Sequence, residues 1–232
     1  MSVAIFFDMW GVLLDPANLP AAWQRLVGDF LAPRLGGEPA AWGRANVYAA
    51  ERMFARYRDP KGTPRETHPR LRRLWLREMC EHVGVPVPKN TGVLAEELIA
   101  WVTGRISSPS PDAGDTVRAL KASGHRIFTS AGAHSTDIDG YLRAMGLREL
   151  FEGVYGSDVI DRWKTNAGFY RKVLERSGVS GHEAVTVDDQ EKCLDWATRA
   201  GFARTFLLAT AGTASRHETI VTLAELPARL AG

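Results

Sequence analysis

The chain has 232 residues, of which 45% are hydrophobic and 24% are charged, and its formal net charge is +2. This composition is typical of a globular protein with one large domain, or with a domain and an insertion. A charge this close to zero gives no general attraction to nucleic acid or to a membrane surface, so we expect neither as a partner. The two cysteines, Cys80 and Cys193, have neither the spacing of a metal site nor that of a disulfide framework.

The sequence also bears on the compartment. No stretch is long and apolar enough to span a bilayer, and the first residues lack the basic segment and cleavage site of a signal peptide. Two cysteines without a disulfide pattern fit a reducing compartment. We therefore expect a cytoplasmic protein, and the sequence leaves its oligomeric state open.

The first fourteen residues predict a buried strand followed by a turn. Residues 3–7 form an apolar run without polar alternation, as in a strand that is covered on both faces of a parallel sheet. Asp8 would then lie at the carboxyl end of the strand, where open α/β sheets bind their ligands. This position suits a carboxylate nucleophile or a metal ligand.

The next stretch, residues 15–108, predicts a helical insertion. It has helical periodicity without convincing strands, and segments rich in glycine and proline divide it. We expect four helices there, at residues 23–35, 40–57, 69–83 and 93–106.

From residue 109 onward, strands alternate with helices. The strands are expected at residues 125–129, 153–156, 184–187 and, as the last one, 204–209. The helices are expected at residues 112–123, 137–145, 167–177, 192–200 and 221–230. This alternation predicts an α/β fold with a parallel sheet and helices on both of its faces.

Four loops with polar side chains would meet at one edge of this sheet. They supply an acid, a hydroxyl, a lysine and a pair of acids, which in chain order are Asp8, Ser130, Lys164 and Asp188 with Asp189. This combination suits phosphoryl transfer. Asp8 would attack phosphorus, Ser130 and nearby N–H groups would hold the phosphoryl oxygens, and Lys164 would neutralise the developing charge.

The same edge predicts a magnesium site and a substrate pocket. Carboxylate and carbonyl oxygens are the ligands that Mg²⁺ prefers, and we expect them from Asp8, Asp188 and Asp189, with the main chain at Trp10. Thr129 is the alternative to Ser130 as the motif hydroxyl. The residues expected to contact a small anionic substrate are Trp10, Gly11, Thr129, Ala131 and Tyr170.

Taken alone, each of these residues more often has a structural role. An aspartate or serine after a strand is usually a turn former or a helix cap, and a lone lysine is usually solvated. An acid pair before a helix can simply stabilise the helix dipole. The occurrence of all four pieces at strand-to-helix junctions favours the catalytic interpretation.

These segments resemble the four motifs of the haloacid dehalogenase-like hydrolase superfamily, in the same order. They are Phe7-Asp8-Met9-Trp10-Gly11-Val12-Leu13, Phe128-Thr129-Ser130-Ala131, Lys164 followed by Phe169-Tyr170, and Val187-Asp188-Asp189 followed by residues 197–202. The resemblance implies a Rossmann-like core of residues 1–14 and 109–232 with Asp8 as nucleophile. It also implies that residues 15–108 are an α-helical cap that closes the active site.

Two departures from the family pattern leave alternatives open. Phosphatases of the superfamily carry a second aspartate where this chain has Trp10, and a general acid of this kind typically contributes ~10²–10⁴-fold to the rate. Haloacid dehalogenases carry a tyrosine there, attack carbon and need no metal, and Tyr170 also resembles them. Their fourth motif carries serine and asparagine instead of Asp188-Asp189, a pair that would be repulsive near Asp8 without a cation.

The sequence therefore predicts, first, a Mg²⁺-dependent hydrolase that acts on a small phosphorylated metabolite. A metal-independent 2-haloacid dehalogenase is the second hypothesis, favoured by Trp10 and Tyr170. The third is a degenerate member that binds its ligand without turnover, because Trp10 replaces the second acid.

Overall fold

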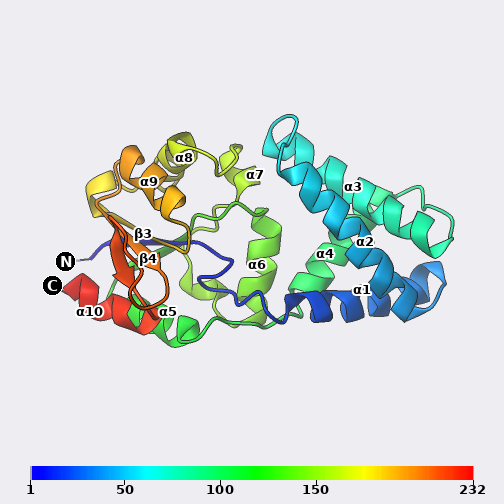
Figure 1. Ribbon diagram of the computed structural model, residues 1–232, viewed down its shortest axis with the longest axis horizontal. Coiled ribbons are helices and arrows are strands. Elements are labelled where there is room, and N and C mark those ends of the chain that lie inside the picture. Colours follow the sequence, from blue (N-terminus) through cyan, green and yellow to red (C-terminus); the bar gives the residue numbers. More distant parts are fainter. Residues whose placement is uncertain (1, 232) are drawn as a thin grey trace.

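A computed structural model describes residues 2–231, and Figure 1 shows its α/β architecture. One parallel sheet has the strand order β2-β1-β3-β4-β5. Its strands are β1 (Ala4–Phe7), β2 (Arg126–Thr129), β3 (Ala184–Asp188), β4 (Arg204–Leu208) and β5 (Glu218–Ile220). All residues of β1 are buried, which confirms the expectation from its unbroken apolar run and, with the parallel pairing, the predicted fold class.

Six of the described helices surround the sheet, and four others form a separate group next to it. The first group is α5 (Ala113–Ala122), α6 (Ser135–Ala144), α7 (Ser157–Ile160), α8 (Ala167–Ser177), α9 (Glu191–Ala200) and α10 (Leu226–Ala231). The second group is α1 (Leu19–Leu35), α2 (Pro39–Tyr57), α3 (Pro64–Val83) and α4 (Thr91–Thr103), called the helical part below. None of these helices of residues 2–231 is long and apolar enough to cross a membrane.

The helical part and the sheet share one hydrophobic core. A continuous cluster of buried side chains runs from Trp42 and Trp75 through Leu98 to Ile127 and Val185. The four helices occur where the sequence predicts them, with earlier starts for α1 and α3. The start of α3 is fixed by Thr63 and Glu66, which form a capping box ahead of the proline at the first helical position.

Two segments connect the helical part to the sheet, and they lie side by side. Leu14 and Pro109 form an antiparallel bridge. Next to it, the Asp15 N–H donates to the Ser108 carbonyl at 2.9 Å, and the Ser108 hydroxyl donates to the Asp15 carbonyl at 3.0 Å. The predicted boundaries at residues 14 and 109 fall on this pair, which is where a hinge would lie. The division into a core and a cap itself stays a prediction.

Three predictions in the sheet part are wrong. Residues 153–156 form no strand and make a single bridge, from Gly153 to Phe128. Gly156 packs so tightly that a β-carbon there would lie 2.5 Å from the main-chain nitrogen of Ser135. The strand at 204–209 is not the last one, because β5 follows it at the sheet edge. The helix predicted over residues 221–230 is a 3₁₀ turn (Leu223–Glu225) followed by the short α10.

Candidate active site

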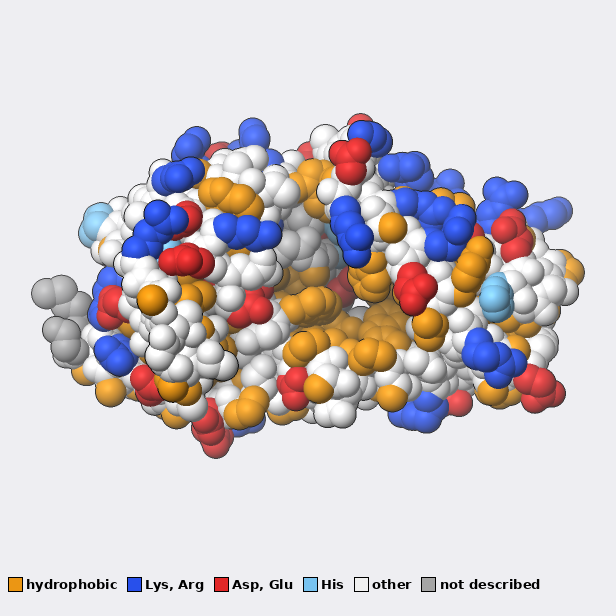
Figure 2. Space-filling model, in the orientation of Figure 1, with side chains coloured by type: hydrophobic (Ala, Val, Ile, Leu, Met, Phe, Trp, Pro, Cys, Tyr) orange, Lys and Arg blue, Asp and Glu red, His pale blue; other side chains and the backbone are white. Residues whose placement is uncertain are grey.

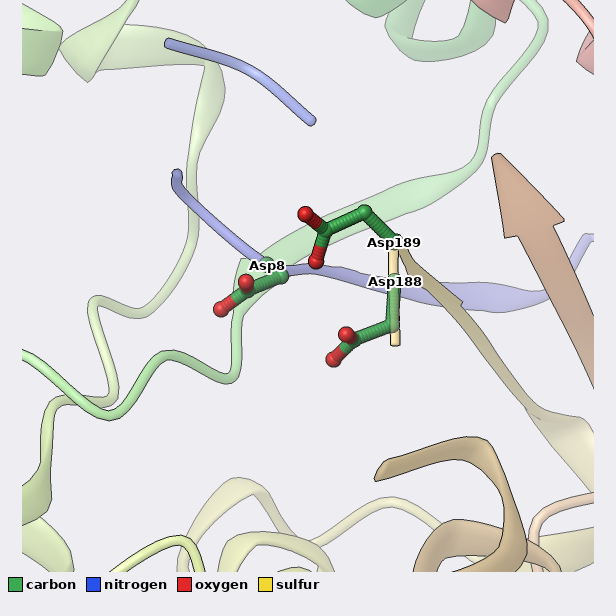
Figure 3. A group of neighbouring side chains, drawn as sticks. All are labelled: Asp8, Asp188 and Asp189. Carbon is green, nitrogen blue, oxygen red and sulfur yellow. The ribbon is translucent and has the colours of Figure 1, made fainter. Parts of the chain in front are cut away.

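The carboxyl ends of three neighbouring strands bring the predicted acids together. Phe7 of β1 pairs with Thr129 of β2 and with Val187 of β3, so the residues that follow them become neighbours. In Figure 3, Asp8 comes from the end of β1, and Asp188 and Asp189 come from the end of β3. One carboxylate oxygen of each lies within 4.8 Å of the others.

Lys164 reaches this group from the loop between α7 and α8. Its Nζ donates to Oδ1 of Asp8 at 2.8 Å and to Oδ2 of Asp188 at 2.7 Å. The lysine side chain is only 8% exposed. Burial alone would lower the pKa of Lys164, but the carboxylates, Asp8 above all, hold it well above its usual value. The lysine is therefore a fixed positive charge shared by two acids.

Asp8 has the environment of an activated carboxylate. Its pKa is raised to about 6: burial has the largest effect, the Lys164 charge lowers the pKa, and the charge of Asp188 raises it. The Asp8 N–H donates to the Val187 carbonyl at 2.9 Å, which fixes the start of the loop. At neutral pH most of this carboxyl is ionised, as a nucleophile must be.

Gly11 makes room for Asp189. A β-carbon on Gly11 would lie 2.5 Å from Oδ2 of Asp189, and the φ angle of Gly11 is +75°. The φ angle favours glycine, since other L residues rarely adopt that backbone conformation, and any β-carbon there would displace the Asp189 carboxylate. Gly11 therefore lies directly beside the Asp189 carboxylate, and its contact with a substrate stays a prediction.

The two candidate hydroxyls have different surroundings. The Ser130 hydroxyl is buried and has no hydrogen-bond partner among the described residues, while its N–H donates to the Phe7 carbonyl at 2.8 Å. The Thr129 hydroxyl accepts from the Tyr155 N–H at 2.8 Å and so holds the loop. The Ala131 N–H also bonds to Tyr155, through its carbonyl at 3.1 Å. Ser130 is therefore the hydroxyl with free capacity for a ligand.

The two aromatic residues of the predicted site lie in different places. Trp10 is 38% exposed and packs edge-on against Tyr141, with ring centroids 5.3 Å apart. Tyr170 is fully buried and its hydroxyl donates to Oδ2 of Asp188 at 3.4 Å. Tyr170 thus contacts a carboxylate of the site from within the core. Figure 2 shows a hollow between the sheet and the helical part, with hydrophobic side chains gathered along its lower side.

The oxygen donors of the site fit a hard divalent cation. Lys164 occupies one oxygen of Asp8 and one of Asp188, and the second oxygen of Asp188 accepts from the Gln190 N–H at 2.9 Å. Oδ2 of Asp8 and the carboxylate of Asp189 lie outside the contacts of the lysine. The main-chain bonds of the turn join Gly11 to Leu14 and Leu14 to Met9, and they do not use the Trp10 carbonyl. Mg²⁺ usually keeps several waters, so a small set of such oxygens suffices.

The sequence of the chain matches a known family of hydrolases. The profile of a family described as haloacid dehalogenase-like hydrolase matches residues 3–201. The chain belongs to this family of hydrolases. No curated protein sequence matches the chain.

Solved structures of the same fold include both dehalogenases and a phosphatase. A defluorinating L-2-haloacid dehalogenase, Rha0230, has a TM-score of 0.69 at 18% identity, covering 100% of this chain and 96% of its own. A HAD phosphatase from Thermococcus onnurineus has a TM-score of 0.65 at 21% identity, covering 100% and 99%. An L-2-haloacid dehalogenase from Xanthobacter autotrophicus, with chloropropionic acid covalently bound, has a TM-score of 0.61 at 15% identity, covering 100% and 99%. At these identities the likeness shows a common fold and does not distinguish between the two reactions.

Proposed function

We propose that the protein is a Mg²⁺-dependent phosphatase in which Asp8 is the nucleophile and the substrate is a small phosphorylated compound. The observation that carries the proposal is the group formed by Asp8, Asp188 and Asp189. Among the described residues, the salt bridges of this group come from Lys164 alone. When all are ionised, three negative charges and one positive charge leave a net charge of −2. Like charges this close repel, and a divalent cation would offset them.

The chain's own groups supply the remaining parts of the reaction. A carboxylate oxygen of Asp8 attacks phosphorus, the bond to the leaving oxygen breaks, and water later hydrolyses the aspartyl-phosphate. The unpartnered Ser130 hydroxyl donates to a phosphoryl oxygen, and Lys164 balances the charge that develops beside Asp8. Mg²⁺, when bound, would polarise a phosphoryl oxygen and reduce the repulsion among the carboxylates.

Trp10 limits the choice of substrate. An indole ring cannot give a proton to the leaving group, so no residue at this position acts as general acid. Substrates whose leaving group departs as a stable anion are therefore favoured. We expect aryl or acyl phosphates to react faster than alkyl phosphates.

A second candidate function is the 2-haloacid dehalogenase reaction. The observations in its favour are the aromatic residue at position 10 and the Tyr170 hydroxyl 3.4 Å from Asp188. In that reaction Asp8 would displace halide from carbon, with Lys164 as the cation that orients the carboxylates. The acid pair Asp188-Asp189 has no evident use there, which is why we place this reaction second.

An assay of two substrate classes tests the proposal. The purified protein is incubated with p-nitrophenyl phosphate, acetyl phosphate and alkyl phosphates, and separately with 2-chloropropionate, each with Mg²⁺ and with EDTA. Phosphate release that requires Mg²⁺ supports the phosphatase. Chloride release that persists in EDTA would replace it with the dehalogenase. Thermal stabilisation by phosphate without any product would indicate a binding protein.

A further inference from the structure

The loop that carries Lys164 is held by the first turns of α3. The Arg65 guanidinium donates from Nε to the Asp158 carbonyl at 2.9 Å and from Nη2 to the Val159 carbonyl at 3.4 Å. From the other side, the Trp163 indole N–H donates to the Gly62 carbonyl at 3.0 Å. These bonds join the helical part to the segment that comes directly before the lysine.

A buried polar chain strengthens the same contact. His68 of α3 is 5% exposed. Its Nε2 bonds to the Ser157 hydroxyl at 2.8 Å and its Nδ1 to the Tyr57 hydroxyl at 2.9 Å. Burial lowers the pKa of His68 to about 3, so the ring is neutral and one nitrogen donates while the other accepts. The Trp163 ring packs on it, with centroids 5.3 Å apart.

We call the contacts that Gly62, Arg65 and His68 make with residues 157–163 the α3 joint. Within this segment, Asp161 has a φ angle of +53°, an uncommon conformation for a residue with a side chain. Its carboxylate accepts from the main-chain N–H of Arg65 at 3.3 Å. A backbone held in a sparsely populated conformation persists only when its surroundings fix it. Arg65 therefore helps to set the path of the chain that leads to Lys164.

The joint lies away from the segments that connect the two parts. In Figure 1 the chain enters α1 at the bottom of the view, whereas α7 and the start of α3 approach each other at the top. A cavity of about 320 Å³ borders the joint and is lined in part by Gly62, Thr63, Asp161 and Trp163. Solvent thus reaches one side of the joint, whereas His68 and Ser157 are buried within it.

We propose that docking of α3 on residues 157–163 places the Lys164 ammonium between Asp8 and Asp188. Closure of the helical part over the site and assembly of the catalytic lysine are then one event. Arg65 and Trp163 are positioning residues, since neither contacts the acids that take part in the reaction. The inference rests on the proposed function insofar as it treats Lys164 as a catalytic group.

The test measures the exposure of Lys164 and the opening of its loop, so it needs no turnover. Acetic anhydride labels Lys164, and the exposed Lys192 is the internal reference. Separately, mass spectrometry follows the hydrogen exchange of residues 157–165. The variants are Arg65→Ala and Trp163→Phe, which keeps an aromatic ring and loses the N–H. Arg77→Ala is the control, because Arg77 lies on the exposed side of α3 and pairs with Glu81.

Both variants are expected to label Lys164 about tenfold faster than the wild type and to exchange faster over residues 157–165, while Arg77→Ala matches the wild type. Arg65→Lys, which keeps a donor for the Asp158 carbonyl, is expected to restore most of the protection. If Arg65→Ala does not fold, Trp163→Phe still decides the question. Unchanged labelling of Lys164 in folded variants, or faster exchange spread evenly over the whole chain, would overturn the proposal. If the wild type releases no phosphate but the variants show the expected labelling, the proposed function is wrong. The link between α3 docking and the position of Lys164 is then still supported.

Discussion

Lys164 and Asp8 are 156 positions apart in the chain, and the lysine Nζ lies 2.8 Å from Oδ1 of the aspartate. The same ammonium lies 2.7 Å from Oδ2 of Asp188. One buried cation therefore compensates two buried acids, and Asp189 remains outside this arrangement. The site therefore keeps an excess of negative charge when all three acids are ionised.

Replacing Gly11 by alanine should both destabilise the protein and weaken Mg²⁺ binding. The φ angle of +75° costs an alanine about 1–2 kcal/mol, and the new β-carbon would displace the Asp189 carboxylate. Gly212→Ala is the matched control, because Gly212 has a φ angle of +84° and nothing within 4 Å of the added carbon. Urea denaturation and calorimetric titration with Mg²⁺ measure the two effects. Equal Mg²⁺ affinity in both variants would show that Gly11 does not shape the metal site.

The Asp189→Asn variant should bind Mg²⁺ at least about tenfold more weakly, since it loses one of the charged oxygen ligands that the cation prefers. The readout is the rise in Tm with Mg²⁺ concentration, because a ligand that binds only the folded state stabilises it. Glu191→Gln is the control, as Glu191 is exposed and bonds to Ser215 instead of joining the carboxylate group. A variant Asp189→Asn with unaltered Mg²⁺ response would remove Asp189 from the site.

The pH dependence should carry the signature of Asp8. Its pKa of about 6 lies above the ordinary value of 3.8, chiefly because of burial. Turnover requires the ionised form, so it should fall about tenfold per pH unit on the acid side of the pKa that Asp8 has in the Mg²⁺-bound protein. Bound Mg²⁺ should move this limb to lower pH, because a nearby cation favours the carboxylate.

The raised pKa of Asp8 also affects stability, but here the protonated form of the carboxyl is the favourable one. Between pH 3.8 and about 6 the folded state binds the Asp8 proton more strongly than the unfolded state does. The contribution of Asp8 to the free energy of unfolding is therefore full below pH 3.8 and is lost as the pH rises through 6. Urea denaturation in EDTA across this range, compared between the wild type and Asp8→Asn, isolates it. A wild type whose stability rises relative to that of Asp8→Asn over the window would contradict the assignment.

Trp10→Asp should raise the rate on alkyl phosphates, by up to ~10²-fold, because it supplies a group able to protonate the leaving oxygen. The variant loses the edge-to-face contact with Tyr141, at a cost of about 1 kcal/mol in stability. Trp10→Asn is the control, since asparagine has the shape of aspartate and no carboxyl proton to donate. If both variants hydrolyse alkyl phosphates equally, the missing general acid is not what limits the wild type.

The sequence predicts those parts of the fold that follow from local patterns. The apolar run of β1 and the glycine after Ser177 define their elements well, and α8 occurs over the residues predicted for it. β5 has only three residues, with Glu218 exposed, and carries no apolar run that would reveal it. Residues 153–156 have the composition of a strand, but the Tyr155 N–H donates to the Thr129 hydroxyl instead of a main-chain carbonyl, and only one bridge to β2 forms.

In the candidate site too, local patterns indicate some residues, and other contacts arise only in the folded chain. Asp8, Ser130, Lys164 and the acid pair are predictable because each follows a recognisable strand or precedes a helix. The bonds of Arg65 to Asp158 and of His68 to Ser157 join residues 93 and 89 positions apart, and no local pattern indicates them. The different surroundings of Thr129 and Ser130 likewise depend on Tyr155, which only the folded chain brings to the Thr129 hydroxyl.

The proposed reaction is Mg²⁺-dependent phosphoryl transfer in which Asp8 is the nucleophile. The most direct test compares phosphate release from p-nitrophenyl phosphate by the wild type and by Asp8→Asn, with Mg²⁺ and with EDTA, after both proteins have been shown to be folded. We predict that the wild type releases phosphate with Mg²⁺ and not with EDTA. The rate of the variant should be at least ~10³-fold lower, since the asparagine amide is a poor nucleophile. Full activity in Asp8→Asn, or activity of the wild type that is indifferent to EDTA, would contradict the account.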